Sequence, residues 1–504
     1  MNYSINTQNF LLIFLIISAL FQSCNKDTGN YTYSDINEAV VTGLDSLYVV
    51  EKEGVINIKP IVSYSKDPVG DTTNYRYAWL ILGKDGYNSG RPNIMDSTFI
   101  FNSKVKLDVG FYSCAFRVTD KNTGVWKQFP FRLFVSSKTY EGWYLLSEVA
   151  NQQSRLDMVS YDPVNKKYIF YEDVFKAAES TLKLEGKPSF ISYLRTLSKP
   201  VIGTSADPIA IATNKMAVLV EPNELKYRPN FNFSVFVQDA TNPAISEKSR
   251  MECKNFISFL SANNKVYTTE GYSKLIQVNF KEDLEPFKAS RFVSHNPATS
   301  ASILFDETES EFVWYPGSGQ QYCQTLNNGK LYNNKIGKNL MYMKYVTYNG
   351  GQNFAILKDK TGNKVYMARF TTSSQLYFQE ITGTQIAQAE NFEVSDVYGY
   401  VFYNVGGKLY EYDFNTKANI LMADYGNKKI SLLKFQYIPY TNDPKKERYL
   451  EITRRLVVCA YDTGNLNTSG TMDIYSVPAR NEKLIKEESY SGMGKIVSID
   501  YRDR

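Results

Sequence analysis

The chain has 504 residues, of which 43% are hydrophobic, and its 57 Lys and Arg against 52 Asp and Glu leave a formal net charge of +5. This length allows more than one domain and a large core, whereas so balanced a charge argues against nucleic-acid binding, which needs a concentrated basic face. With one histidine in the whole chain, multi-histidine metal sites are excluded and any histidine-based catalysis depends on His295.

The N-terminal segment predicts export from the cytoplasm. Residues 10–21 (FLLIFLIISALF) are apolar or small, a length typical of a signal-peptide core and short of the roughly 20 residues that a membrane span needs. The following Ser23-Cys24 resembles the lipobox of bacterial lipoproteins. The resemblance implies that residues 1–23 are a removed signal peptide, that Cys24 carries the lipid, and that the polar residues 24–35 form a flexible tether. An ordinary secretory signal is the alternative.

Residues 36–137 predict a β-sandwich. Short alternating apolar runs are separated by Gly, Asn and Asp turns, and about seven such strands in roughly 100 residues are typical of this fold. Tyr75, Tyr77 and Trp79 fall on one face of a strand, so we expect Trp79 in the core. Cys114 lies in a similar alternating strand and is expected to be a buried small hydrophobe.

Two stretches of this segment resemble known families. Residues 110–124 (GFYSCAFRVTDKNTG) resemble the end of a PKD domain, where Gly-x-Tyr precedes a core strand and Asp and Gly make the next hairpin. Residues 30–38 (NYTYSDINE) and Gly43-Leu44-Asp45 resemble the start of the PKD-like lipoproteins of Bacteroidetes. The resemblance covers residues 24 to about 150. It implies an outer-membrane location and a SusC/SusD-type nutrient importer as partner, and brings no catalytic residues.

Residues 138–504 contain a degenerate repeat. Each copy has an apolar strand, a tight Asp, Asn or Gly turn, and a second strand with an aromatic residue; the second strands begin near residues 167, 215, 265, 311, 364, 408 and 471. A period of about 50 residues with several strands per unit is typical of β-propellers. We therefore predict an all-β protein in which the sandwich precedes a seven-bladed propeller. Six or eight blades, or two unrelated all-β domains, are the alternatives.

The two ends of the repeat region each predict a strand. Residues 142–146 (GWYLL) form the first and residues 495–501 (KIVSIDY) the last. Because a propeller commonly completes one blade with a strand from the other end of the domain, we expect these two strands in the same blade or in neighbouring blades.

Few residues point to catalysis or metal binding. His295 lies in a polar stretch and is expected to be a surface loop residue. The four acidic residues of 306–311 offer paired carboxylates for glycoside cleavage, but they span a predicted turn. The oxygen ligands of 462–473 do not have EF-hand spacing. Cys253, Cys323 and Cys459 lack CxxC spacing, so a zinc site is not expected, while one disulfide among them stays open. With no P-loop, GxSxG or HExxH motif, we predict no cofactor, no metal and no enzymatic activity.

Exposed aromatic residues are the remaining candidates for ligand contact, because they offer large contact areas at small entropic cost. Trp126 lies two residues past Gly124, and Trp314 follows a turn of the repeat. Both are candidate ligand or partner contacts, with core packing the alternative for Trp314.

Together these features predict a non-enzymatic binding lipoprotein of the cell surface. It is anchored through Cys24 and either captures an oligomeric nutrient, a glycan or a peptide, or docks on a SusC/SusD-type importer. One alternative is a propeller lyase or glycoside hydrolase with two facing carboxylates in a central funnel. The other is a structural or adhesion protein without a small ligand.

Overall fold

The computed structural model describes residues 36–195, 207–223, 225–227, 232–238, 243–255, 257–270, 274–317, 320, 322–439 and 447–504. The predicted signal peptide, Cys24 and the tether lie outside these residues. The chain divides into two compact units between Ser136 and Ser137, here called the N-terminal and C-terminal units. Both are built from strands, which confirms the all-β prediction.

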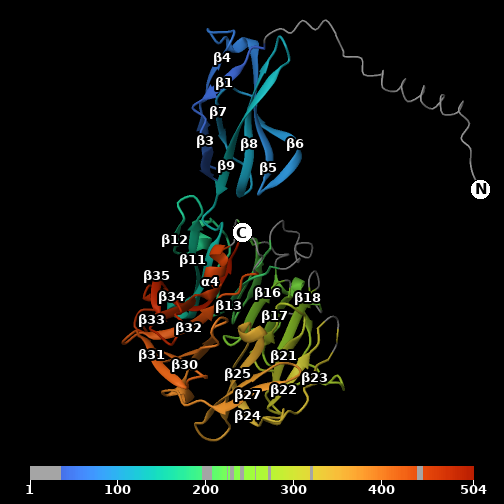
Figure 1. The fold of residues 1–504 in the computed structure, drawn as a ribbon, viewed down its shortest axis with the longest axis vertical. Helices are drawn as coiled ribbons and strands as arrows, with labels where there is room; N and C mark the ends of the chain where they lie inside the picture. Colours follow the sequence, from blue (N-terminus) through green and yellow to red (C-terminus); the bar gives the residue numbers. More distant parts are fainter. Residues whose placement is uncertain are drawn as a thin grey trace, which may run out of the picture. The chain divides into compact units, whose positions relative to one another are not determined.

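The N-terminal unit contains one large sheet and two small ones (Figure 1). The large sheet has the order β2 (Leu47–Glu51), β9 (Trp126–Ser136), β8 (Gly110–Asp120), β5 (Tyr75–Lys84) and β6 (Tyr87–Asp96). The small sheets pair β1 (Ala39–Thr42) with β4 (Ile61–Tyr64) and β3 (Val55–Ile58) with β7 (Phe101–Lys104), and a 3-10 turn, η1 (Thr72–Asn74), precedes β5. β2 joins β9 in parallel, and the other pairings are antiparallel.

Trp79 lies at the centre of the N-terminal core, as predicted. It is 0% exposed, its indole Nε1 donates to the Thr98 carbonyl at 3.0 Å, and its ring lies 4.5 Å from that of Phe116. The same cluster includes Ile58 of β3 and Phe101 of β7, so the core lies between the large sheet and the small ones. The alternation along β5 produces this arrangement, because alternate side chains of a strand face the same side.

The C-terminal unit contains seven antiparallel sheets in its described residues (Figure 1). We number them in chain order. The first is β36 (Lys495–Arg502), β10 (Gly142–Val149), β11 (Gln153–Asp162) and β12 (Lys167–Tyr171); the second is β13 (Pro188–Tyr193), β14 (Ile209–Thr213) and β15 (Ala217–Val220); the third is β16 (Arg250–Lys254), β17 (Ile257–Ala262), β18 (Lys265–Glu270) and β19 (Ile276–Gln277).

The remaining four sheets have four strands each. The fourth is β20 (Ser294–His295), β21 (Ser302–Asp306), β22 (Glu311–Tyr315) and β23 (Gln324–Thr325); the fifth is β24 (Lys338–Val346), β25 (Gln352–Asp359), β26 (Val365–Phe370) and β27 (Gln375–Glu380); the sixth is β28 (Asn391–Val394), β29 (Val401–Val405), β30 (Lys408–Asp413) and β31 (Ala418–Asp424); the seventh is β32 (Lys429–Phe435), β33 (Leu456–Tyr461), β34 (Gly470–Ser476) and β35 (Ile485–Met493). Short helical segments connect some strands: η2 (Ala150–Gln152), α2 (Val174–Ala177), η4 (Phe233–Phe236), η5 (Tyr348–Gly350), η6 (Ile386–Gln388) and α4 (Glu447–Arg454).

The turns of the predicted repeat are hairpins of these sheets. In the second to seventh sheets, the repeat turn joins the second strand of the sheet to the third. The first strands of these six sheets are β13, β16, β20, β24, β28 and β32. In the first sheet the turn at 162–167 joins the third and fourth strands, because the C-terminal β36 is the first strand there. The turn residues act locally. The Asp306 carboxylate accepts from the backbone N–H groups of Thr308 (2.8 Å) and Glu309 (3.3 Å), as expected for an aspartate that closes a turn.

The pairing of the two ends of the C-terminal unit is confirmed. β36 pairs with β10 in one antiparallel sheet, with Leu145 opposite Ile499 and Trp143 opposite Tyr501. Asp500 of β36 also joins this sheet to its neighbours. Its Oδ2 accepts from the backbone N–H of Tyr193 at 2.7 Å, and its Oδ1 accepts from the side-chain amide of Gln436 at 2.6 Å.

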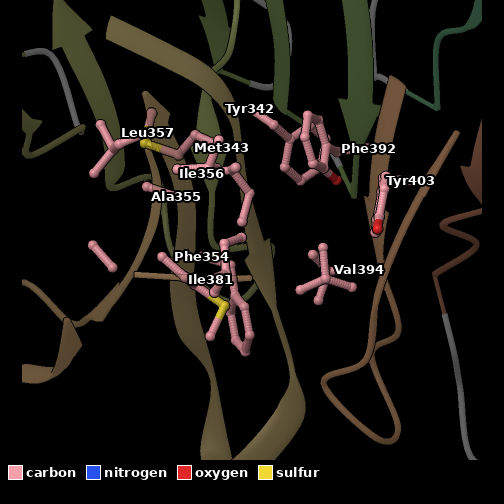
Figure 2. Packing of buried hydrophobic residues seen from close by; sticks show 14 of the residues in the cluster. Tyr342, Met343, Phe354, Ala355, Ile356, Leu357, Ile381, Phe392, Val394 and Tyr403 are labelled. Carbon is pink, nitrogen blue, oxygen red and sulfur yellow. The ribbon is translucent and has the colours of Figure 1, made fainter. Parts of the chain in front are cut away.

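Hydrophobic clusters fill the space between successive sheets. Figure 2 shows the cluster in which Phe354 and Ile356 of the fifth sheet lie near Phe392, Val394 and Tyr403 of the sixth. Apolar residues at alternate strand positions thus join neighbouring sheets. Such a β unit cannot bury its own apolar face alone, so the sheets depend on one another for stability.

A buried acid anchors the helix α4 to the first sheet, and we predict that its neutralisation destabilises the C-terminal unit. The Glu141 carboxylate, 4% exposed, forms an ion pair with Arg448 and accepts from the Tyr501 hydroxyl at 2.8 Å. Arg448 keeps 31% of its side chain exposed, so the change Glu141→Gln is expected to cost about 1–3 kcal/mol rather than the full penalty of a dry ion pair. Chemical denaturation measures this loss.

The matched control is Glu380→Gln, which removes the charge from the exposed Lys364–Glu380 pair and should leave stability nearly unchanged. Equal effects of the two changes would contradict the assignment of Glu141 as an anchor.

Candidate ligand-binding cavity

A cavity of about 430 Å³ lies within the C-terminal unit and is lined by residues from all seven sheets. Each sheet contributes its first strand or residues beside it, namely β36, β13, β16, β20, β24, β28 and β32. Most of these strands also contact one another in succession, since β36 contacts β13 and β32, and β24 contacts β20 and β28. We call this space the central cavity.

The polar lining follows from the sequence of the strands. All five residues of β16 line the central cavity, and two of them, Met251 and Cys253, also belong to the hydrophobic cluster shared with the second sheet. The period of two along a strand separates these two sets of side chains. The strand RMECK therefore supplies three charged groups to the cavity, while its two apolar residues also pack into the core.

Lys344 and Glu393 form a buried ion pair in the lining. The Lys344 Nζ lies 2.7 Å from the Glu393 carboxylate and 3.6 Å from that of Asp396, and the Tyr342 hydroxyl donates to Glu393 at 3.0 Å. Burial alone would lower the pKa of Lys344, but Glu393 and Asp396 outweigh it and hold the pKa above its ordinary value. This lysine is a fixed positive charge of the cavity.

Glu252 and Lys254 form a looser pair, 3.9 Å apart, and differ in exposure, because the Glu252 side chain is 55% exposed and that of Lys254 only 8%. Partial desolvation inside the cavity would raise the pKa of Glu252, but Lys254, Lys434 and Lys344 outweigh this effect and lower the pKa. For Lys254, burial lowers the pKa, and the attraction of Glu252 only partly offsets this.

The electrostatics of these carboxylates suit binding better than acid catalysis. A general acid needs a raised pKa so that it keeps its proton at neutral pH. The pKa of Glu252 is instead lowered by neighbouring lysines, which hold this carboxylate ionised. In the part of the chain that the structure describes, no group of three or more His, Cys, Asp or Glu side chains is placed to hold a metal ion.

His295 lies at this cavity and not on an exposed loop, so the prediction for this residue is wrong. It is part of β20, is 4% exposed and lines the central cavity. Its Nδ1 lies 3.0 Å from the Ser302 hydroxyl and its ring lies 5.0 Å from that of Phe259. The short hairpin from β20 to β21 turns this polar stretch inward. Burial, with a smaller contribution from Lys254, lowers the pKa of His295 to about 3.

We predict that His295 stays neutral in the folded protein and makes it sensitive to acid. Because its pKa falls from 6.5 to about 3 on folding, the unfolded chain binds a proton that the native protein does not. Stability present above pH 6.5 is therefore lost as the pH falls toward 3. The loss from this group between pH 7 and pH 5 is about 2 kcal/mol.

The chain has one histidine, so in untagged protein labelled with ¹³C-histidine a single Hε1 resonance reports its protonation. We expect no titration of this signal between pH 7 and pH 5, and a weaker pH dependence of stability in His295→Asn. A titration midpoint near 6.5 would show that the imidazole is solvated.

Neither of the two predicted contact tryptophans is among the residues that line the central cavity. Trp126 begins β9 in the N-terminal unit, is 56% exposed, and has the Arg117 guanidinium over its ring at 4.8 Å. Trp314 on β22 is partly buried against the cluster of the fifth sheet. Its Nε1 has no hydrogen-bond partner among the described residues. A contact role for either stays a prediction.

Asp306, Asp473 and the cysteines, which belong to the other predicted candidates, make contacts within the protein or are buried. Asp306 is 1% exposed and pairs with Lys281 at 2.8 Å, so it is a buried turn residue and not a solvated one. Asp473 of the 462–473 group bonds instead to Lys486 and Ser489 of β35, at 2.8 and 2.6 Å. The four cysteines that the structure describes are buried and free, so the open disulfide does not form.

Sequence reasoning missed the charged lining of the cavity. Charged residues alternate with apolar ones in RMECK (250–254), and this pattern was the available signal. In an ordinary antiparallel sheet, however, this alternation indicates only that one face of the sheet is exposed to solvent. The sequence of one strand does not show that the polar faces of several sheets surround a single cavity.

Residues 24–188 match the model of the PKD-like family. The match covers the N-terminal unit and the start of the C-terminal unit. A comparison with curated proteins finds no match.

Among solved structures, a quinonprotein alcohol dehydrogenase-like protein from Bacteroides thetaiotaomicron is 11% identical, covers 92% of this chain and 100% of its own, and has a TM-score of 0.38. The extracellular domain of a one component system from the same organism is 10% identical and has a TM-score of 0.34. The match covers 93% of this chain and 70% of that one. YCF48 from Cyanidioschyzon merolae is 10% identical and has a TM-score of 0.37. The match covers 64% of this chain and 97% of that one. Likenesses this distant do not bear on the chemistry of the cavity. In the described part of this chain, no helix is long and apolar enough to cross a membrane.

Proposed function

We propose that the seven sheets of the C-terminal unit are the blades of a seven-bladed β-propeller and that the central cavity is its ligand site. Three observations support this. The repeat hairpins recur at one place in successive sheets, β36 completes the first sheet from the far end of the sequence, and every sheet contributes residues to one cavity. Such a ring leaves an axial space into which the innermost strands present alternate side chains.

We further propose that the protein is an outer-membrane lipoprotein of the cell surface, anchored through lipid on Cys24 and accessory to a SusC/SusD-type nutrient importer. Its role is to capture an oligomeric nutrient, a glycan or a peptide. The observation that carries the binding role is the central cavity, which is large enough for part of an oligomer and offers fixed charges and hydroxyl groups for orientation. The anchor and the importer rest on the sequence resemblance.

Purification of the lipidated protein from its native membrane in gentle detergent tests the assignment. Mass spectrometry of the complex should identify an importer of the SusC/SusD type, and mass spectrometry of the mature N-terminus should find lipid on Cys24. The matched control is Cys24→Ser, which should lose the lipid and appear in the soluble fraction. Recovery of the lipidated protein alone would contradict the importer partnership, and an unmodified Cys24 in membrane-bound protein would contradict the anchor.

A further inference from the structure

Arg250 and Arg291 lie together at the central cavity. Both line it, and both guanidinium groups lie over the ring of Phe292, with their Cζ atoms 4.7 and 4.9 Å from its centroid. Phe292 is buried in the cluster of the fourth and fifth sheets, so it holds the two arginines on a rigid support. Cation–π contact with one ring orients both groups.

Neither arginine has an ion pair among the described residues, although the cavity lining also contains acidic residues. Glu247 pairs with Lys187 at 3.5 Å, Glu148 with Lys495 at 2.8 Å, and Glu252 with Lys254 at 3.9 Å. These three carboxylates of the lining therefore have lysine partners of their own. The result is a local surplus of positive charge held by Arg250 and Arg291.

The charged form of Arg291 is destabilised by its surroundings, as its lowered pKa shows. Burial lowers its pKa to about 10, and repulsion from Arg250 adds to the effect, while Glu307 offsets only part of it. Glu307 itself pairs with Lys288 at 3.4 Å. Two guanidinium groups that lie at one ring and repel each other are stabilised by an anion that binds both. Each guanidinium is planar and can donate two parallel hydrogen bonds to an oxyanion.

We propose that Arg250 and Arg291 form an oxyanion subsite of the central cavity, and that the captured oligomer is an acidic oligosaccharide whose carboxylate or sulfate group they bind. The choice of a sugar rests on the proposed nutrient-binding function and on the rest of the lining. Tyr342, Ser431 and Asn391 also line the cavity. Each donates a hydrogen bond within the protein, to Glu393, the Cys459 carbonyl and Asn404 respectively, but its oxygen can still accept from a ligand rich in hydroxyl groups.

The first experiment tests the subsite without any oligomer. Thermal unfolding of the full chain is followed with increasing acetate, sulfate or phosphate, at constant ionic strength balanced with chloride. The wild-type midpoint should rise with one or more of these oxyanions, and Arg250→Gln/Arg291→Gln should show no such rise. The matched control, Lys360→Gln/Arg480→Gln, removes two exposed charges outside the cavity and should behave as wild type. An equal response of all three proteins would overturn the subsite.

The second experiment identifies the ligand class by calorimetric titration with oligogalacturonate, a sulfated heparin oligosaccharide, neutral maltooligosaccharide and oligoglutamate. We expect one of the two acidic sugars to bind, to weaken as salt rises, and to lose about 10- to 100-fold in affinity in the double arginine variant. The sugar that binds distinguishes carboxylate from sulfate. Binding of oligoglutamate alone would overturn the sugar assignment, and equal binding of the neutral sugar would overturn the need for an anion. If the small oxyanions bind at the arginines but none of the four oligomers does, the subsite stands and the sugar assignment falls.

Discussion

Removal of residues 495–504 is expected to abolish the cooperative unfolding transition of the C-terminal unit. The truncation deletes β36, which pairs with β10 along its length and buries Ile496, Ile499 and Tyr501 in the cluster with Trp143. It also removes Asp500, which bonds to the second and seventh sheets. Because the edge of β10 and the apolar faces on both sides become exposed at once, the loss exceeds the 5–15 kcal/mol that stabilises a typical domain.

Circular dichroism and differential scanning calorimetry measure this result. The N-terminal unit serves as an internal reference, since its transition should remain. A truncation that removes only Asp503 and Arg504 is the matched control. It keeps β36 but loses the ion pair of Asp503 with the buried Arg195 and the bonds of Arg504 to Tyr449 and Tyr140. The melting temperature should therefore fall, but a cooperative transition of the C-terminal unit should remain. An unchanged transition after removal of 495–504 would show that β36 is dispensable, which would contradict the proposed ring.

The second large effect is expected from Trp79→Ala in the N-terminal unit. The ring is 0% exposed and contacts Phe101, Phe116 and Phe131, so truncation opens a cavity at the centre of the core. It also leaves the Thr98 carbonyl without its indole donor. A change of this kind costs about 3–5 kcal/mol, a large share of the stability of a domain of this size.

Equilibrium denaturation of the full chain, monitored for the transition of the N-terminal unit, gives the value. Trp126→Ala is the matched control within the same unit. Its ring is 56% exposed and contacts the Arg117 guanidinium at 4.8 Å, so its loss should cost less than about 1 kcal/mol. Similar losses for the two changes would mean that Trp79 is not the centre of the core.

The elements that could be predicted are those whose causes are local in sequence. The hairpins of the C-terminal unit are set by short turns, as where Asp306 bonds to the next N–H groups of its own turn, and the spacing of these turns predicts the repeat. Strand alternation likewise places Trp79 in the core. Such signals need only a few neighbouring residues, so a single sequence is enough to detect them.

The candidate site could not be predicted in the same way, because its residues come from seven sheets. Arg250 and Arg291 are 41 residues apart in the sequence, and only the packing of the third and fourth sheets brings both onto Phe292. His295 shows the same limit. Its polar neighbours in the sequence indicate an exposed loop. In the structure His295 belongs to β20, which pairs with β21 and lines the cavity, and this pairing cannot be detected from the neighbouring residues alone.

The position of β36 has a consequence for the order in which the protein matures. The strand that completes the first sheet is made after every other strand of the unit, so no intermediate on the ribosome or in transit across a membrane can bury the edge of β10 with its native partner. The N-terminal unit, whose strands all precede residue 137, is free to fold while the rest is still emerging. The C-terminal unit therefore stays incomplete until β36 has been made, and the cavity with Arg250 and Arg291 is fully formed only when this last strand has joined β10.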